Sequence, residues 1–207
     1  MMTQVRSYPA PPVCEREILR YAGCRQADEA TLSLLRSCLR EAQTVLTYTV
    51  CWQQWNAPIL SRDLEKNLAG SEKNLVFAAT VGVGLDRLIA KYSRLSPAKG
   101  LMMQAIGAER IEALCDTFCK DMETEFGLWA GARFSPGYGD LPLTAQRDIF
   151  ATLACEKHLG LYLNDRLMMT PSKSVTAFLG LFPEKKPKTG NKCAACNKTD
   201  CAFRGVL

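Results

Sequence analysis

The chain has 207 residues, 47% apolar and 23% charged, the composition of an ordinary globular protein with one substantial core. Its net charge of +5 is uneven, because residues 183–207 carry a net +4 and residues 1–182 only +1, which argues against a nucleic-acid-binding body. No apolar run approaches the length of a membrane span, and residues 1–12 lack a signal-peptide core, so we expect a cytoplasmic protein without a membrane partner. The ten cysteines are then reduced thiols or metal ligands.

The first part of the chain predicts two helices and a strand. Residues 14–22 form a short helix that ends at Gly23, and Asp28 caps a second helix. The apolar stripe of that helix consists of Leu32, Leu35, Leu39 and Ala42, with Cys38 beside it as a core thiol. Apolar and polar residues alternate over 44–52, which indicates a half-buried strand.

The next segment predicts a helix, a buried strand and a glycine-containing turn. Ser61 is the expected N-cap of a helix over 62–68, and the continuous apolar run 75–79 indicates a strand covered on both faces. A Gly-Val-Gly turn over 82–84 then leads into a helix through Tyr92. Such a turn can direct backbone N–H groups at a ligand, but the third glycine of the dinucleotide fingerprint is missing, and a tight turn alone explains both glycines.

The longest periodic segment is 99–126, which predicts a helix with one apolar face. That face consists of Ile111, Leu114 or Cys115, Phe118, Met122 and Phe126. Glu112, Asp116 and Lys120 recur every four residues along its flank. On spacing alone they form a solvated stripe, in which an Asp-to-Lys pair contributes about 0.2–0.5 kcal/mol.

Arg133 begins a turn with the composition of a small-molecule site. It is the only cation between Glu123 and Asp140, and the Pro136-Gly137 pair that follows must turn the chain. An arginine forks two donors onto a carboxylate, and a glycine lets the backbone approach a flat ligand. Because Tyr138 adds a ring and a hydroxyl, the group suits a zwitterion that carries an aromatic base.

The last part of the body predicts a helix and a hairpin. Residues 144–158 are helical with Gly160 as the stop signal, and two strands, 161–170 and 174–182, are joined at 171–173. Helices and strands are interspersed along the chain. We therefore expect an α+β fold with a mixed or mainly antiparallel twisted sheet and flanking helices.

The C-terminal tail carries a cysteine array. The body, 1–182, is followed by a second unit, 183–207, which consists of a solvated Lys/Pro linker at 184–192 and the cysteine tail. Cys193, Cys196 and Cys201 follow in a C-x2-C-x4-C spacing that can wrap zinc or an iron–sulfur cluster. Both normally require four ligands and three are local, so iron–sulfur, zinc and free thiols remain open.

Several of these stretches together resemble the activation domain of cobalamin-dependent methionine synthase. The resemblance rests on Arg-x-x-x-Gly-Tyr at 133–138 and the helix that ends at 156–160, and it extends over roughly 74–182 with the turn at 78–86 and the hairpin at 167–182. In that family the Arg, Gly and Tyr line the S-adenosylmethionine site. The resemblance implies an S-adenosylmethionine site formed by Glu112, Arg133, Ser135, Gly137 and Tyr138.

The resemblance also implies an activity. Cobalamin on a partner is sometimes oxidised to inactive Co(II), and one electron together with the methyl group of S-adenosylmethionine would restore methyl-Co(III). The single histidine, His158, lies outside any Asp-x-His-x-x-Gly motif, so cobalamin is expected only on a partner methionine synthase or other corrinoid protein. We expect a stand-alone reactivation protein, with flavodoxin or ferredoxin as the electron donor.

Two other functions remain open from the sequence. One is a metal-binding adaptor, in which a zinc-type basic tail recruits nucleic acid or an acidic protein and the body binds no ligand. The other keeps S-adenosylmethionine but transfers its methyl group to a small acceptor. The absence of an obvious general base counts against the second.

Overall fold

The computed structural model describes residues 2–57 and 61–185. Its main element is a five-stranded sheet in the order β1-β2-β3-β7-β4, in which all neighbours pair antiparallel. The strands are β1 Gln4–Ser7, β2 Thr49–Gln54, β3 Lys73–Thr80, β4 Trp129–Ala130 and β7 Ser174–Phe182. A separate two-stranded sheet consists of β5 Tyr162–Leu163 and β6 Met169–Thr170. The α+β prediction with a mainly antiparallel sheet is confirmed.

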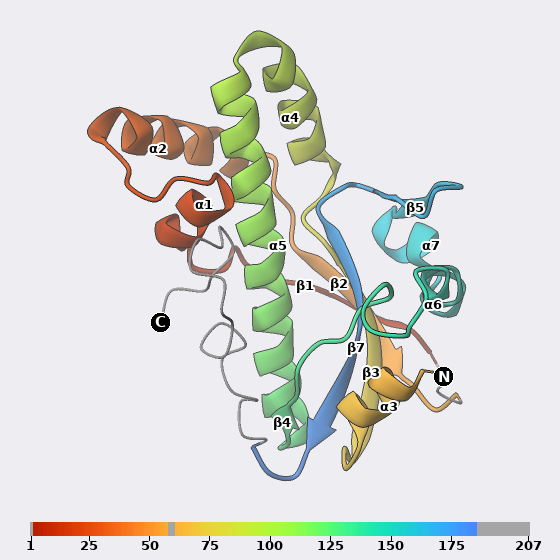
Figure 1. Cartoon of the computed structure of the whole chain (residues 1–207). Helices are drawn as coiled ribbons and strands as arrows, with labels where there is room; N and C mark the ends of the chain where they lie inside the picture. The colour runs from red at the N-terminus through yellow and green to blue at the C-terminus, as the bar shows by residue number, and fades with distance from the viewer. Residues whose placement is uncertain (1, 58–60, 186–207) are drawn as a thin grey trace.

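Seven helices flank the sheets in the described residues. They are α1 Glu15–Tyr21, α2 Glu29–Gln43, α3 Arg62–Leu68, α4 Val83–Leu95, α5 Pro97–Phe126, α6 Ala145–Leu153 and α7 Cys155–Leu159. The 30-residue helix α5 runs the length of the molecule, with α1 and α2 beside it (Figure 1). Helices α6 and α7 lie on the other side of the sheet strands in the same view (Figure 1).

The sheet separates two apolar layers. Alternate residues of β3 point to opposite faces, so Leu75 and Phe77 belong to the larger cluster with α5, whereas Val76 belongs to the smaller cluster with α3, α6 and α7. Phe118 of α5 packs on Phe77, with ring centroids 4.7 Å apart. The prediction that the strand at 75–79 is covered on both faces is confirmed.

The local signals for helix ends are also confirmed. The side chain of Asp28 accepts a hydrogen bond of 2.8 Å from the Thr31 N–H at the start of α2, and the Ser61 hydroxyl accepts one of 3.0 Å from the Leu64 N–H in α3. Each side chain satisfies one of the backbone donors that a helix N-terminus leaves unpaired.

Residues 82–84 form a tight turn. Gly82 has a φ of +85°, and a Cβ on Gly84 would lie 2.6 Å from the Val45 carbonyl oxygen. Close packing therefore accounts for both glycines, and neither lines the cleft described below.

The strand predicted for 44–52 is present, but it starts later than predicted and is covered on both faces rather than half-buried. The strand begins at Thr49, and Cys51, which the alternation places on the solvent face, is fully buried in the smaller cluster with Cys155. Helix α7 covers that face, and alternation within one strand cannot predict a covering helix a hundred residues later.

The helix predicted over 144–158 is interrupted. Ala154 takes a left-handed conformation, with φ 47° and ψ 51°, and separates α6 from α7. Cys155 and Leu161 then enter the smaller apolar cluster. The apolar spacing on both sides of Ala154 suits a continuous helix, and the break is visible only in the tertiary structure.

The hairpin predicted at 167–182 is also wrong. Strand β7 pairs with β3 and β4, whereas residues 162–170 form the separate β5–β6 hairpin. The Asn164 side chain causes the turn inside that stretch, because its oxygen accepts hydrogen bonds from the Arg166 N–H at 3.0 Å and the Met168 N–H at 2.9 Å. No helix in the described residues combines the length and the hydropathy needed to cross a bilayer.

Candidate functional site

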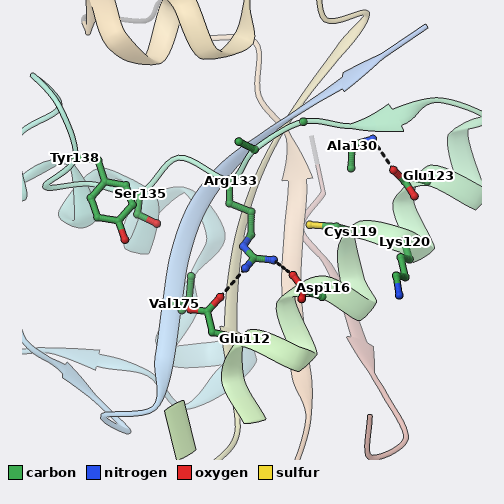
Figure 2. A pocket seen from close by; sticks show the side chains of 12 residues that line it. Glu112, Asp116, Cys119, Lys120, Glu123, Ala130, Arg133, Ser135, Tyr138 and Val175 are labelled. Carbon is green, nitrogen blue, oxygen red and sulfur yellow. Dashed lines mark hydrogen bonds and ion pairs between the residues drawn. The ribbon is translucent and has the colours of Figure 1, made fainter. Parts of the chain in front are cut away.

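A cleft of about 550 Å³ opens between α5 and the segment from Ala130 to Tyr138 (Figure 2). Helix α5 forms one wall, the segment after β4 forms the other, and Val175 of β7 also contributes. Its lining consists of Glu112, Asp116, Cys119, Lys120, Glu123, Ala130, Gly131, Ala132, Arg133, Ser135, Tyr138 and Val175. The volume is within the range of about 300–1,000 Å³ typical of small-molecule sites.

Helix α5 supplies a row of polar side chains to this cleft. Its apolar face, which includes Phe118 and Met122, is fully buried against the sheet and fixes the rotation of the helix. Glu112 and Asp116, one turn apart, therefore point to the opposite wall (Figure 2). The interpretation of this flank as a plain solvated stripe is wrong, since both carboxylates bond to Arg133.

Arg133 bridges the two carboxylates. Its Nη1 donates to Asp116 Oδ1 and its Nη2 to Glu112 Oε2, each at 2.5 Å, and its side chain is 23% exposed (Figure 2). The three side chains together carry a net charge of −1. A carboxylate that binds Arg133 must therefore share the guanidinium with Glu112 and Asp116 or displace one of them.

Cys119 borders the cleft as a neutral thiol. Burial raises the pKa of Cys119 to about 11, and burial also raises the pKa of Cys115, one turn earlier in α5. A thiolate, which is the nucleophilic form, is therefore disfavoured at neutral pH in spite of the nearby Arg133 charge. Cys115 is fully buried behind the wall, so Cys119 is the thiol that lines the cleft.

The segment after Arg133 is held to the sheet and then turns sharply. Phe134 and Phe178 exchange backbone hydrogen bonds of 3.0 and 2.8 Å, and the Tyr138 N–H donates to the Ser135 carbonyl at 3.1 Å. Gly137 has a φ of +89°, where residues other than glycine are strained, so the predicted turn is present. The Tyr138 side chain is 60% exposed, and its ring meets the Phe134 ring edge-on at 6.3 Å.

Four of the five residues predicted for the binding site line one cleft. They are Glu112, Arg133, Ser135 and Tyr138. Gly137 shapes the turn between Ser135 and Tyr138 but does not line the wall. The structure thus brings together residues from α5 and from a loop about twenty positions later.

Sequence reasoning missed several residues that complete the site. Asp116 is the second carboxylate on Arg133, and its four-residue spacing from Glu112 was the only signal for it. The Glu123 carboxylate accepts a hydrogen bond of 3.0 Å from the Ala130 N–H and ties β4 to α5 (Figure 2). No local pattern indicated that contact, because the position of the Ala130 N–H relative to α5 depends on the pairing of β4 with β7 in the sheet.

The metal site predicted from the sequence concerns residues outside the described part of the chain. Within residues 2–57 and 61–185, no group of three or more His, Cys, Asp or Glu side chains is arranged to hold a metal ion. Cys193, Cys196 and Cys201 fall outside the described residues, so the metal-site prediction stays a prediction.

Comparisons with known proteins agree on one relationship. The family model "Vitamin B12 dependent methionine synthase, activation domain" matches residues 64–200, about two thirds of the chain, and extends past Phe182 into the tail. Among solved structures, one titled "Crystal Structure of the MetH Reactivation Domain bound to AdoHcy" superposes with a TM-score of 0.60 at 16% identity, and covers 89% of this chain and 80% of that one. No curated protein matches.

Proposed function

Because the chain belongs to the family of vitamin B12-dependent methionine synthase activation domains, we propose that it binds S-adenosylmethionine and supports reductive methylation of inactive cob(II)alamin on a partner protein. We propose further that residues 1–182 form the binding body. The partner is a cobalamin-binding methionine synthase or another corrinoid protein.

The observation that carries this proposal is the meeting of Arg133, Ser135, Tyr138 and Glu112 in one cleft. Arg133 offers a planar fork that matches the methionine carboxylate, and Tyr138 offers an exposed ring and hydroxyl for the adenosine half. The solved relative with the same fold holds S-adenosylhomocysteine, which is S-adenosylmethionine without the transferred methyl group. That ligand supports the assignment of a cleft of this size and polarity to S-adenosylmethionine.

The task of this chain in the reaction is placement. An external donor supplies one electron that reduces the partner's Co(II) to Co(I); the methyl carbon then forms a bond to cobalt while its bond to sulfur breaks, which leaves methyl-Co(III) and neutral S-adenosylhomocysteine. Arg133 holds the ligand carboxylate, and the Ser135–Tyr138 turn orients the rest, so that the methyl group faces outward in line for transfer. The methyl transfer requires no proton removal, which agrees with a cleft whose thiol Cys119 stays protonated.

Cobalamin itself is assigned to the partner. The only histidine of this chain, His158, lies near the end of α7 and does not line the cleft. His158 is also not part of an Asp-x-His-x-x-Gly motif, which is the kind of motif that binds cobalamin. The electron donor is proposed to be a flavodoxin or ferredoxin, which the basic residues of the tail would attract.

The tail is proposed to take part in electron delivery. Cys193, Cys196 and Cys201 supply three thiolates within nine residues. An iron–sulfur cluster on them would relay the electron, whereas zinc would give the tail a structural role. Both kinds of site normally take four ligands, so one further ligand would join these three thiolates.

Two measurements on one anaerobically purified sample test the proposal. Isothermal titration with S-adenosylmethionine is expected to show one site per chain. Addition of the chain to a cob(II)alamin-loaded methionine synthase, with a reductant, is expected to accelerate the appearance of the methylcobalamin spectrum. Absence of S-adenosylmethionine binding would refute the proposal and favour the adaptor function, and binding without acceleration would point to a different methyl acceptor.

A further inference from the structure

We propose that Asp140 is a positioning residue for the ligand site, which places Tyr138 by bonding the turn to the first residues of α3. The inference rests on the proposed function, since it concerns how tightly S-adenosylmethionine is held. Asp140 itself does not line the cleft.

The Asp140 carboxylate makes three hydrogen bonds across the start of α3. Its Oδ1 accepts from the Ser61 hydroxyl at 2.5 Å and from the Asp63 N–H at 3.1 Å, while its Oδ2 accepts from the Arg62 N–H at 3.0 Å. Ser61 is 1% exposed and its oxygen also accepts from the Leu64 N–H, so the contact links the turn to a buried group. The bond from the Ser61 hydroxyl lowers the pKa of Asp140, which is therefore ionised at neutral pH.

Gly139 lets the turn approach α3 closely enough for these bonds. Its φ is +53°, and a Cβ at this position would lie 2.4 Å from Asp63 Oδ2. The backbone therefore passes directly over the helix start, and Asp140 follows at once.

Tyr138 lies between two fixed points of the chain. On one side, Phe134 is bonded to Phe178 in the sheet, and on the other, Asp140 is bonded to α3. Between them the Gly137 N–H donates to the Leu141 carbonyl at 2.8 Å, and the Leu141 N–H donates to the Tyr138 carbonyl at 3.0 Å. The turn is closed on itself and moves as a unit, so its position depends on these two anchors and on the buried Leu141 side chain.

Helix α3, to which Asp140 bonds, packs into the core. Leu64 and Leu68 of α3 are buried in the smaller apolar cluster, together with Leu141 from the turn and Phe178 from β7. The Tyr138 ring, by contrast, is largely exposed and contacts the edge of Phe134. Its place in the cleft is thus set by the backbone that Asp140 holds rather than by packing of the ring.

The test compares Asp140→Ala with Asp28→Ala in the full chain. Asp28 is a matched control, because it also accepts a backbone hydrogen bond at a helix start, on α2, which contributes no residue to the cleft. Both substitutions are expected to lower the melting temperature. We expect Asp140→Ala alone to weaken S-adenosylmethionine binding, by up to about tenfold, because the ligand must then order a turn that is no longer held in place.

A double-mutant cycle with Tyr138→Ala separates positioning from general destabilisation. If Asp140 acts through Tyr138, adding Asp140→Ala to Tyr138→Ala changes the dissociation constant by less than about twofold. Ser61→Ala, which removes one of the three bonds, is expected to weaken binding by an intermediate factor and serves if Asp140→Ala does not fold.

The outcomes are distinct. Unchanged affinity in Asp140→Ala and Ser61→Ala, with normal binding by the unaltered chain, overturns the inference and leaves the proposed function standing. A full additional loss in the Tyr138→Ala background also overturns it. Failure of the unaltered chain to bind S-adenosylmethionine refutes the proposed function itself, and the inference with it.

Discussion

Substitution of Arg133 by alanine gives the sharpest test of the ligand site. In the structure this guanidinium is shared between Glu112 and Asp116, so alanine removes both ion pairs as well as the proposed contact with the ligand carboxylate. The two losses affect different measurements, because the ion pairs contribute to folding and the ligand contact contributes to affinity.

The expected magnitudes follow from exposure and charge. Hydrogen bonds to a charged carboxylate contribute about 1.5–3 kcal/mol, or roughly ten- to a hundredfold in affinity. Arg133 already has two carboxylate partners before a ligand arrives, which offsets part of this gain, so we expect about 1.5 kcal/mol, roughly tenfold. The carboxylate partners are 46% and 65% exposed, so loss of both ion pairs is expected to cost no more than about 1 kcal/mol of folding stability.

Arg6 of β1 provides a matched control, because its two carboxylate partners belong to the same helix. It bonds to Asp121 and Glu125, one turn apart on α5, as Arg133 does to Glu112 and Asp116. Urea unfolding of Arg6→Ala and Arg133→Ala is expected to show similar small losses, whereas isothermal titration shows weaker S-adenosylmethionine binding only for Arg133→Ala. Arg133→Lys is expected to restore little, since lysine lacks the planar fork. Equal affinity of Arg133→Ala and the unaltered chain would remove this residue from the site.

Three further predictions concern the core, acid stability and the tail. Phe118 is fully buried between Trp52 and Phe77, so Phe118→Ala is expected to lower the free energy of unfolding by about 3–5 kcal/mol. A loss below about 1 kcal/mol in urea unfolding would contradict the packing. The Tyr92 hydroxyl donates to the Glu41 carboxylate at 2.7 Å and lowers the pKa of Glu41, so this contribution to stability is complete above the unfolded pKa of about 4.3 and is lost as the pH falls through the lower folded value. In thermal melts from pH 7 to pH 3, the melting temperature of Tyr92→Phe should therefore decline less steeply with acid than that of the unaltered chain. An unchanged slope would count against the bond. Truncation after Phe182 is expected to leave S-adenosylmethionine affinity intact while it slows reactivation with the physiological donor, and reactivation at the full rate would exclude a redox role for the tail.

The sequence by itself determined most of the local structure. The N-caps Asp28 and Ser61, the apolar stripe of α5 and the continuous apolar run of β3 were all predicted, because each depends on residues a few positions apart. The family resemblance, carried by the short motif at 133–138, also came from the sequence, and the match over residues 64–200 confirms it. Glu112, Arg133, Ser135 and Tyr138 were chosen on that basis, and the structure brings them to one cleft.

Only the tertiary structure decided which distant groups meet. It paired β7 with β3 rather than with the stretch before it, gave Arg133 a second carboxylate in Asp116, and bonded Asp140 to the start of α3, 77 to 79 positions away. Local periodicity reports which face of an element is apolar, but it does not identify the element that covers that face. Which strands pair depends on how the helices cover both faces of the sheet together. The position of the turn at 133–138 follows from that packing.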